Sequence, residues 1–156
     1  MGYGVLQGEE EPLTILGYGT LSVPSTRPIA VRLHHLHQAL LKIIISYQPT
    51  EVAVEEPFVA QNVRSALAIG QAQAVAIIAA TSQGVPVYNY TPTQIKRIAT
   101  GFGKCGKEQV QEILKIQLGL PTCPDTDAAD ALAVSLCHVR QQGFDRLLPK
   151  KNGKSR

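Results

Sequence analysis

The sequence has no apolar run long enough to cross a membrane. The longest candidate, around Ala74–Ala80, is far shorter than the ~20 apolar residues of a spanning helix. The first residues lack the charged segment followed by an apolar one that is typical of a signal peptide. The three cysteines, Cys105, Cys123 and Cys137, do not have metal-site spacing. These absences argue against a membrane-spanning or disulfide-stabilised protein and favour a cytoplasmic one with reduced thiols.

Strong charge of one sign is also missing. The formal net charge of +3 does not by itself identify a nucleic-acid-binding protein. The length of 156 residues and the 44% hydrophobic content are enough for one compact core. We therefore expect one domain over residues 1–143. A basic, polar tail over 144–156 is expected to be disordered.

Hydrophobic patterning predicts an α/β protein. Short apolar runs favour strands at 3–7, 13–23, 51–55 and 85–90, and apolar spacings of three or four favour helices at 29–44 and 64–82. Gly17 and Gly19 are expected to mark a bulge or a twist in the second strand. Helix 64–82 is apolar on all sides around Ala74–Ala80, so it must be covered on more than one face. We expect one face to pack on the sheet and another on a second subunit.

Three acidic residues are candidates for a site. Asp127 and Asp130 lie three residues apart at a predicted helix start, which places both on one face, and the small Ala128 and Ala129 would leave access open. Alone, this spacing is more typical of a helix cap. Glu55 ends a buried strand, the position where ligands gather in open α/β sheets. Carboxylate ligands of this kind favour Mg²⁺ or Mn²⁺.

Five motifs in order carry a family resemblance. They are Val54–Phe58, Ser65–Ala72, Gln94–Lys96, the glycine-rich Gly101–Val110, and Asp127–Leu132. Together they resemble the RuvC family of bacterial Holliday-junction resolvases, over about Gly2 to His138. The resemblance implies a ribonuclease-H-like mixed sheet flanked by helices, with strand order 3-2-1-4-5, and a structure-selective, metal-dependent endonuclease acting in recombination and repair.

One feature of the family is missing from this sequence. Its members begin with a strand that ends in a catalytic Asp, whereas here the sequence starts at Met1-Gly2-Tyr3-Gly4. That first strand would lie in the middle of the sheet, so we expect two neighbouring strands to be unpaired. A start placed too far downstream or a shortened gene is the expected explanation, ahead of an inactive relative.

The resemblance assigns roles to particular residues. It implies that Glu55, Asp127 and Asp130 hold the metal and that Lys107 joins them in catalysis, with Mg²⁺, or Mn²⁺, as a pair of ions in a complete four-acid site. It implies DNA contacts by the set Phe58, Gln61, Asn62, Arg64, Lys96 and Lys107. Phe58 either stacks on an unpaired base or packs in the core. The glycine-rich loop before Lys107 is also a weak candidate for a phosphate site.

Partners and alternatives follow from the same resemblance. It implies a homodimer built around helix 64–82, four-way junction DNA as substrate, and a branch-migration helicase complex as a further partner. Because one acid is missing, a non-catalytic junction-binding dimer stays open. A nuclease of this fold that acts on a flap or an RNA–DNA hybrid stays open as well.

Overall fold

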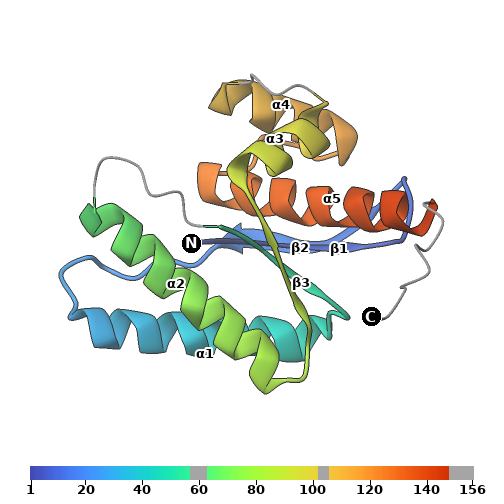
Figure 1. Ribbon diagram of the computed structural model, residues 1–156. Coiled ribbons are helices and arrows are strands. Elements are labelled where there is room, and N and C mark those ends of the chain that lie inside the picture. The colour runs from blue at the N-terminus through green and yellow to red at the C-terminus, as the bar shows by residue number, and fades with distance from the viewer. Residues whose placement is uncertain (57–62, 102–105, 148–156) are drawn as a thin grey trace, which may run out of the picture.

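Five helices and four strands make up the described part of the chain. The computed structural model describes residues 1–56, 63–101 and 106–147. In chain order the elements are β1 Gly2–Gln7, β2 Thr14–Thr20, α1 Ile29–Tyr47, β3 Val52–Glu55, α2 Val63–Ser82, β4 Val87–Tyr90, α3 Pro92–Thr100, α4 Lys107–Gln117 and α5 Thr126–Leu147 (Figure 1). The expected α/β class is confirmed. Helix α5 ends at Leu147, past the predicted domain end at 143, and the rest of the predicted tail lies outside the described residues.

The described strands form two separate pairs. β1 pairs with β2 in antiparallel fashion, and β3 pairs with β4 in parallel. The register shifts by one residue where Val5 faces Gly17 and Leu6 faces Ile15, which confirms the predicted bulge. β1 and β3 each have one paired neighbour among the described strands.

Local sequence signals set the helix ends. Thr91 caps α3: its Oγ1 accepts from the Gln94 N–H at 3.3 Å, while the Gln94 side chain accepts from the Thr91 N–H at 2.8 Å. Pro92 then occupies the first turn, where its missing N–H costs nothing. Helix α1 ends at Gln48, whose φ of 47° is the left-handed conformation typical of a helix C-terminus.

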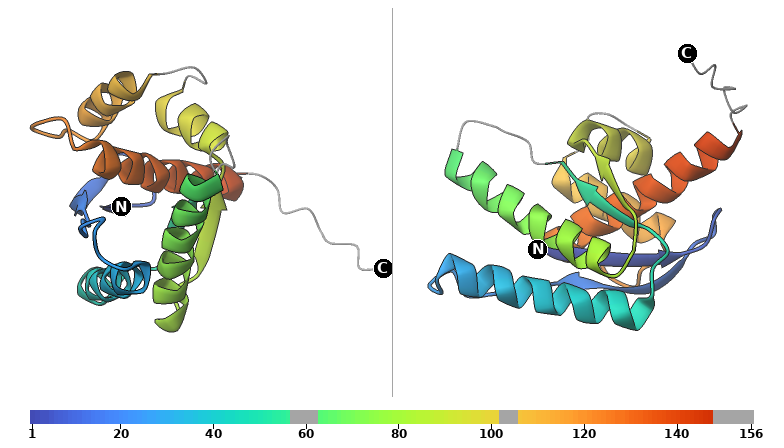
Figure 2. Two further views of the ribbon diagram at one scale, coloured as in Figure 1. Left: turned by 90° about the vertical axis from the view of Figure 1, so that its left-hand side faces the viewer. Right: turned by 60° about the horizontal axis from the view of Figure 1, so that its bottom comes forward.

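Helix α5 is the centre of the larger core. It runs along β1 with α3 and α4 on its other side, while α1 and α2 form a separate layer (Figures 1 and 2). Gly4 allows the close approach of β1, because a Cβ there would lie 2.9 Å from Leu132 Cδ2. Leu114, Leu132, Leu136 and Cys137 are fully buried in this core.

Helix α2 is only partly covered. Ala79 and Ala80 are fully buried against α1 and the β3–β4 pair, but Leu67, Ile69 and Ile78 are more than half exposed. The sequence prediction that this helix needs cover on more than one face is consistent with that exposure. The second subunit stays a prediction. No helix in the described ranges is both long and apolar enough to span a bilayer.

Candidate active site

Three predicted site acids lie around one cavity. Glu55 ends β3, Asp127 and Asp130 lie in the first turns of α5, and all three line a cavity of about 790 Å³ between the two strand pairs. Figure 1 shows the end of β3 beside the start of α5 and the N-terminus. Two segments that are far apart in sequence therefore bring their acids to one end of one cavity.

Glu55 and Asp130 influence each other electrostatically. Burial raises the pKa of Glu55 and the Asp130 carboxylate raises it further, while the Lys96 ammonium opposes both effects. A positive charge between Glu55 and Asp130 would favour the deprotonated form of both carboxyl groups. Lys96, on α3, already brings one cation towards Glu55, so the predicted pairing of acids with a lysine from a neighbouring helix is consistent with the electrostatics.

Asp127 has a different partner. Its Oδ2 accepts a hydrogen bond from the Met1 ammonium at 2.9 Å, and that ammonium also donates to the Leu21 carbonyl at 3.2 Å. Among the described residues, no three His, Cys, Asp or Glu side chains are close enough together to hold a metal ion. The carboxylate oxygens suit a hard divalent cation, so the chemistry of the set fits Mg²⁺. The three-ligand assignment stays a prediction.

The alanines between the acids do not have the role expected for them. Ala128 and Ala129 are 2% and 1% exposed, so they do not leave an open approach to a substrate. The i and i+3 positions of α5 face the cavity, while the two positions between them turn towards the protein interior. β1 packs closely against this turn of α5: a Cβ at Gly2 would clash with the Asp127 carbonyl.

Most of the predicted DNA contacts lie outside the described residues. Phe58, Gln61 and Asn62 fall in the gap at 57–62. Arg64 and Lys107 lie in the first turns of α2 and α4, but their side chains are not described. Lys96 is the one predicted DNA contact whose side chain belongs to the described part, where it is exposed on α3.

The weak phosphate site predicted at the start of α4 stays a prediction. The Gly106 N–H there donates to the Gln109 side chain at 2.9 Å, and Glu108 supplies a negative charge in the first turn. Both features partly satisfy the helix N-terminus, which reduces its attraction for phosphate.

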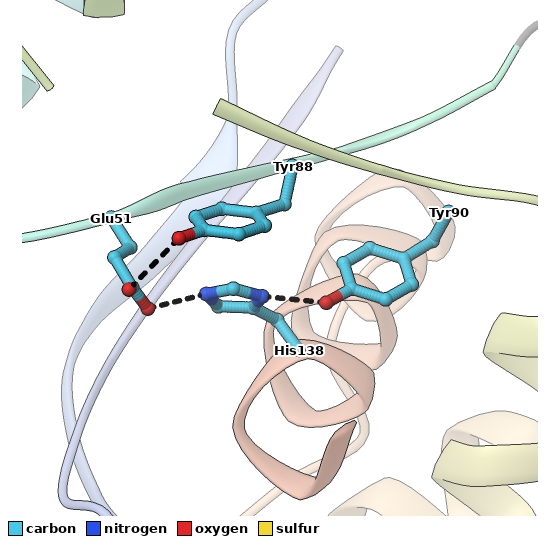
Figure 3. Close-up of polar contacts among 4 residues, drawn as sticks. All are labelled: Glu51, Tyr88, Tyr90 and His138. Carbon is cyan, nitrogen blue, oxygen red and sulfur yellow. Dashed lines mark hydrogen bonds and ion pairs between the residues drawn. The ribbon is translucent and has the colours of Figure 1, made fainter. Parts of the chain in front are cut away.

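A polar cluster at the opposite end of the cavity was missed by the sequence analysis. His138 Nε2 lies 2.8 Å from Glu51 Oε2, and its Nδ1 lies 2.7 Å from the Tyr90 hydroxyl. The Tyr88 hydroxyl donates to Glu51 Oε1 at 3.3 Å, and Figure 3 shows the four side chains converging from α5, β4 and the start of β3. No local motif signals this cluster, because Glu51 and His138 are 87 residues apart.

The protonation pattern of the cluster follows from its hydrogen bonds. Burial raises the pKa of Tyr90 to about 12, so its hydroxyl stays protonated near neutral pH and donates to His138 Nδ1. Nε2–H of His138 then donates to Glu51. The chain Tyr90–His138–Glu51 thus ties the central helix to the β3–β4 pair.

Comparison with known proteins identifies the family. Residues 1–138 match the family model described as "Crossover junction endodeoxyribonuclease RuvC". The chain is 44% identical to the protein of that name from Dehalococcoides mccartyi, over 95% of this chain and 89% of the relative, and 41% identical to that from Magnetococcus marinus, over 95% and 83%. The structure of Thermus thermophilus RuvC in complex with a Holliday junction substrate matches with a TM-score of 0.86 and 31% identity, covering 92% of this chain and 88% of that one. The chain therefore belongs to the RuvC family of crossover junction endodeoxyribonucleases.

Proposed function

We propose that this protein is a structure-selective endonuclease that resolves four-way DNA junctions in recombination and repair in the cytoplasm. The observation that carries the proposal is the meeting of Glu55, Asp127 and Asp130 at one cavity, in a chain that belongs to this family. The solved relative bound to a Holliday junction supports the choice of substrate.

The acids would hold the metal. Glu55 and Asp130 repel each other, and Asp127 lies on the same cavity wall, so the three carboxylates would bind Mg²⁺, or Mn²⁺, as oxygen ligands. When bound, such ions neutralise charge on the phosphate and lower the pKa of water.

The basic residues would contact the DNA strand. Lys96 lies near Glu55, so its ammonium can stabilise negative charge on a phosphate placed at the acids. Lys107 begins α4 and is proposed to position the same strand. Phe58, Gln61 and Asn62, which precede α2 in the sequence, and Arg64, in its first turn, are proposed to contact bases and phosphates near the cut.

The first test compares two neighbouring acids. Glu55→Gln should lower Mg²⁺-dependent cleavage of a four-way junction by at least about 100-fold, while Glu56→Gln, one residue further and outside the cavity, should cut nearly as fast as the wild type. Junction binding should not weaken in either variant, because each removes a negative charge that repels phosphate. An equal loss of cleavage activity in both variants would count against the assignment of Glu55 to the active site.

The choice of substrate is tested in parallel. A four-way junction, a flap and an RNA–DNA hybrid should be cut in that order of preference, with the junction first. A preference for one of the other two would reassign the chain to a different nuclease of the same fold.

A non-catalytic junction-binding protein is the second candidate. One observation favours it: the described acids do not form a three-ligand group. It predicts tight junction binding by the wild type with no cleavage in Mg²⁺ or Mn²⁺. Cleavage that depends on Glu55 would exclude it.

A symmetric dimer is proposed to present two sites to one junction. Leu67 and Ile78 expose apolar surface on one face of α2, and a second copy of the helix would cover it. Ile78→Glu should therefore shift the protein towards monomer in analytical ultracentrifugation and lower paired cutting of both strands. The control is Leu147→Glu, which changes an 83% exposed residue at the far end of α5. A branch-migration helicase complex is proposed as a further partner.

A further inference from the structure

The polar cluster around His138 joins the same two elements that carry the candidate metal ligands. His138 lies on α5, whose first turns hold Asp127 and Asp130, and Glu51 directly precedes β3, which ends at Glu55. The hydrogen bond between them measures 2.8 Å from His138 Nε2 to Glu51 Oε2. It therefore connects α5 to β3 at one end of the contact between these elements, while the acids lie at the other end.

The hydrogen-bonded pair and the acids lie on the same faces of β3 and α5. Side chains alternate along a strand, and Ala53 packs against the α5 core, so Glu51 and Glu55 on either side of it are also directed towards α5. On α5, Asp130 and His138 are separated by about 80° around the helix axis, from about 100° per residue over eight residues. A bond between the first pair thus constrains the surface that carries the second.

The spacings along the two elements also match. Glu51 and Glu55 are four residues apart, which is about 13 Å along a strand at roughly 3.3 Å per residue. Asp130 and His138 are eight residues apart, which is about 12 Å along a helix at about 1.5 Å per residue. Contact of His138 with Glu51 therefore brings Asp130 level with Glu55, and the effect of the Asp130 carboxylate on Glu55 agrees with this placement.

The His138 ring is held on several sides, so its position is well defined. It is 7% exposed, its Nδ1 accepts from the Tyr90 hydroxyl at 2.7 Å, and its centroid lies 4.7 Å from that of Tyr88 and 5.7 Å from that of Tyr90 (Figure 3). The Tyr88 hydroxyl also donates to Glu51 Oε1. The Glu51 side chain is 35% exposed, so it can be replaced without opening the core.

We propose that His138 and Glu51 form a positioning clamp: their hydrogen bond fixes α5 along β3 and so holds Asp130 and Glu55 at the separation that a shared Mg²⁺ requires. Both are positioning residues, because they act through the acids and not on the ion. Groups that hold metal ligands in place contribute strongly to metal affinity. The clamp rests on the proposed function, since it assumes that these acids bind the ion.

The test uses two substitutions of similar size at Glu51. Glu51→Gln keeps an oxygen that accepts from His138 Nε2–H, whereas Glu51→Leu has no acceptor and breaks the clamp. Both remove the same negative charge, so any long-range attraction for the ion changes equally in the two variants. Isothermal titration calorimetry without DNA should show Mg²⁺ binding about tenfold weaker in Glu51→Leu than in Glu51→Gln. Equal affinities in the two variants would overturn the proposal.

A further variant separates positioning from a general loss of stability. Tyr90→Phe removes the hydrogen bond to His138 Nδ1 but leaves the bond from His138 to Glu51. It should lower the urea midpoint, as Glu51→Leu does, because each loses one hydrogen bond of the cluster. Its Mg²⁺ affinity should nevertheless stay near that of the wild type. A comparable loss of affinity in Tyr90→Phe and Glu51→Leu would mean that any loosening weakens the site, and the clamp would be refuted.

Junction cleavage provides a second measurement. In Glu51→Leu, the Mg²⁺ concentration for half-maximal cleavage should rise about tenfold, while the Kd for the junction in a chelator should not change. The reason is that the clamp acts on the acids and not on the DNA contacts. A weaker junction Kd with an unchanged Mg²⁺ requirement would overturn the proposal.

Glu55→Gln distinguishes failure of the clamp from failure of the proposed function. If Glu55→Gln weakens Mg²⁺ binding and Glu51→Leu does not, the clamp alone is wrong. If neither substitution weakens it, or if the wild type does not bind Mg²⁺, the metal site itself is wrong and the clamp is refuted with it. Weaker binding in both, with Glu51→Gln close to the wild type, is the result that the clamp predicts.

Discussion

The two sides of the molecule differ in how completely they are packed. Around α5, twelve buried residues from β4, α3, α4, α5 and the segment between α4 and α5 form one continuous core. Between α1, α2 and the β3–β4 pair, only Ile44, Ala79 and Ala80 reach the same degree of burial among the described residues. Helix length does not explain this difference in burial, because α1 and α2 are among the longest helices.

The difference lies in what covers each helix. Helix α5 has β1 on one side and α3 and α4 on the other, whereas α1 and α2 face the cavity and leave Ile45, Leu67 and Ile78 more than half exposed. Apolar surface of this extent favours association with another surface. The well-packed side supplies stability, and the open side supplies the proposed dimer face of α2.

The largest loss of stability is expected from a substitution that leaves a cavity in the α5 core. Leu132→Ala should lower the free energy of unfolding by about 2–5 kcal/mol, because Leu132 is 0% exposed and the void cannot be filled by solvent. Ile78→Ala on the open side should change it by less than about 0.5 kcal/mol. Urea denaturation of both variants provides the measurement, and similar losses would remove the contrast between the two sides.

A medium effect is expected where the two sides are joined by the polar cluster. His138→Ala removes the partner of both the Tyr90 hydroxyl and the Glu51 carboxylate, so it should cost about 1–3 kcal/mol. The matched control, His34→Ala, changes an exposed histidine on α1 and should have little effect. The same urea titration compares them, and an unchanged midpoint for His138→Ala would mean that the cluster does not hold α5 to β3.

Sequence patterns anticipated the parts of this arrangement that depend on local chemistry. The apolar spacing of α1 and the bulge at Gly17 are set by residues within a few positions of each other. Motif order then placed Glu55 and Asp130 together, which the electrostatic coupling between them supports.

The features that were not anticipated depend on long-range packing. Glu51 and His138 meet across 87 residues, and the buried position of Ala128 depends on how closely β1 approaches α5. The hydrogen bond of the Met1 ammonium to Asp127 spans 126 residues and needs the folded strand pair to form. Such contacts leave no periodic or motif signal, so only the tertiary structure reveals them.

The smallest effect on stability should come from Glu55, the acid at the boundary between the two sides. Burial and then Asp130 raise the pKa of Glu55, so its charged form is less favourable in the folded protein than in the unfolded chain. The stability linked to this group is therefore present at low pH, where Glu55 is protonated, and is lost as the pH rises through its folded pKa. Glu55→Gln should stabilise the metal-free protein at pH 7, by about 0.5 kcal/mol or less because solvent screens this exposed side chain.

Measuring this effect with and without Mg²⁺ separates a structural role for Glu55 from a metal-binding one. Thermal unfolding in a chelator should give Glu55→Gln the higher midpoint at pH 7, and the gain should vanish as the pH falls and the wild-type carboxyl becomes protonated. Saturating Mg²⁺ should then raise the midpoint of the wild type more than that of the variant, because an ion that binds only the folded state stabilises it. The Glu56→Gln control should respond to Mg²⁺ as the wild type does. A Glu55→Gln variant that gains as much from Mg²⁺ as the wild type would mean that the acidic end of the cavity does not bind the ion through Glu55, and the contrast between a stable side and a functional side would then have to rest on the proposed dimer face of α2.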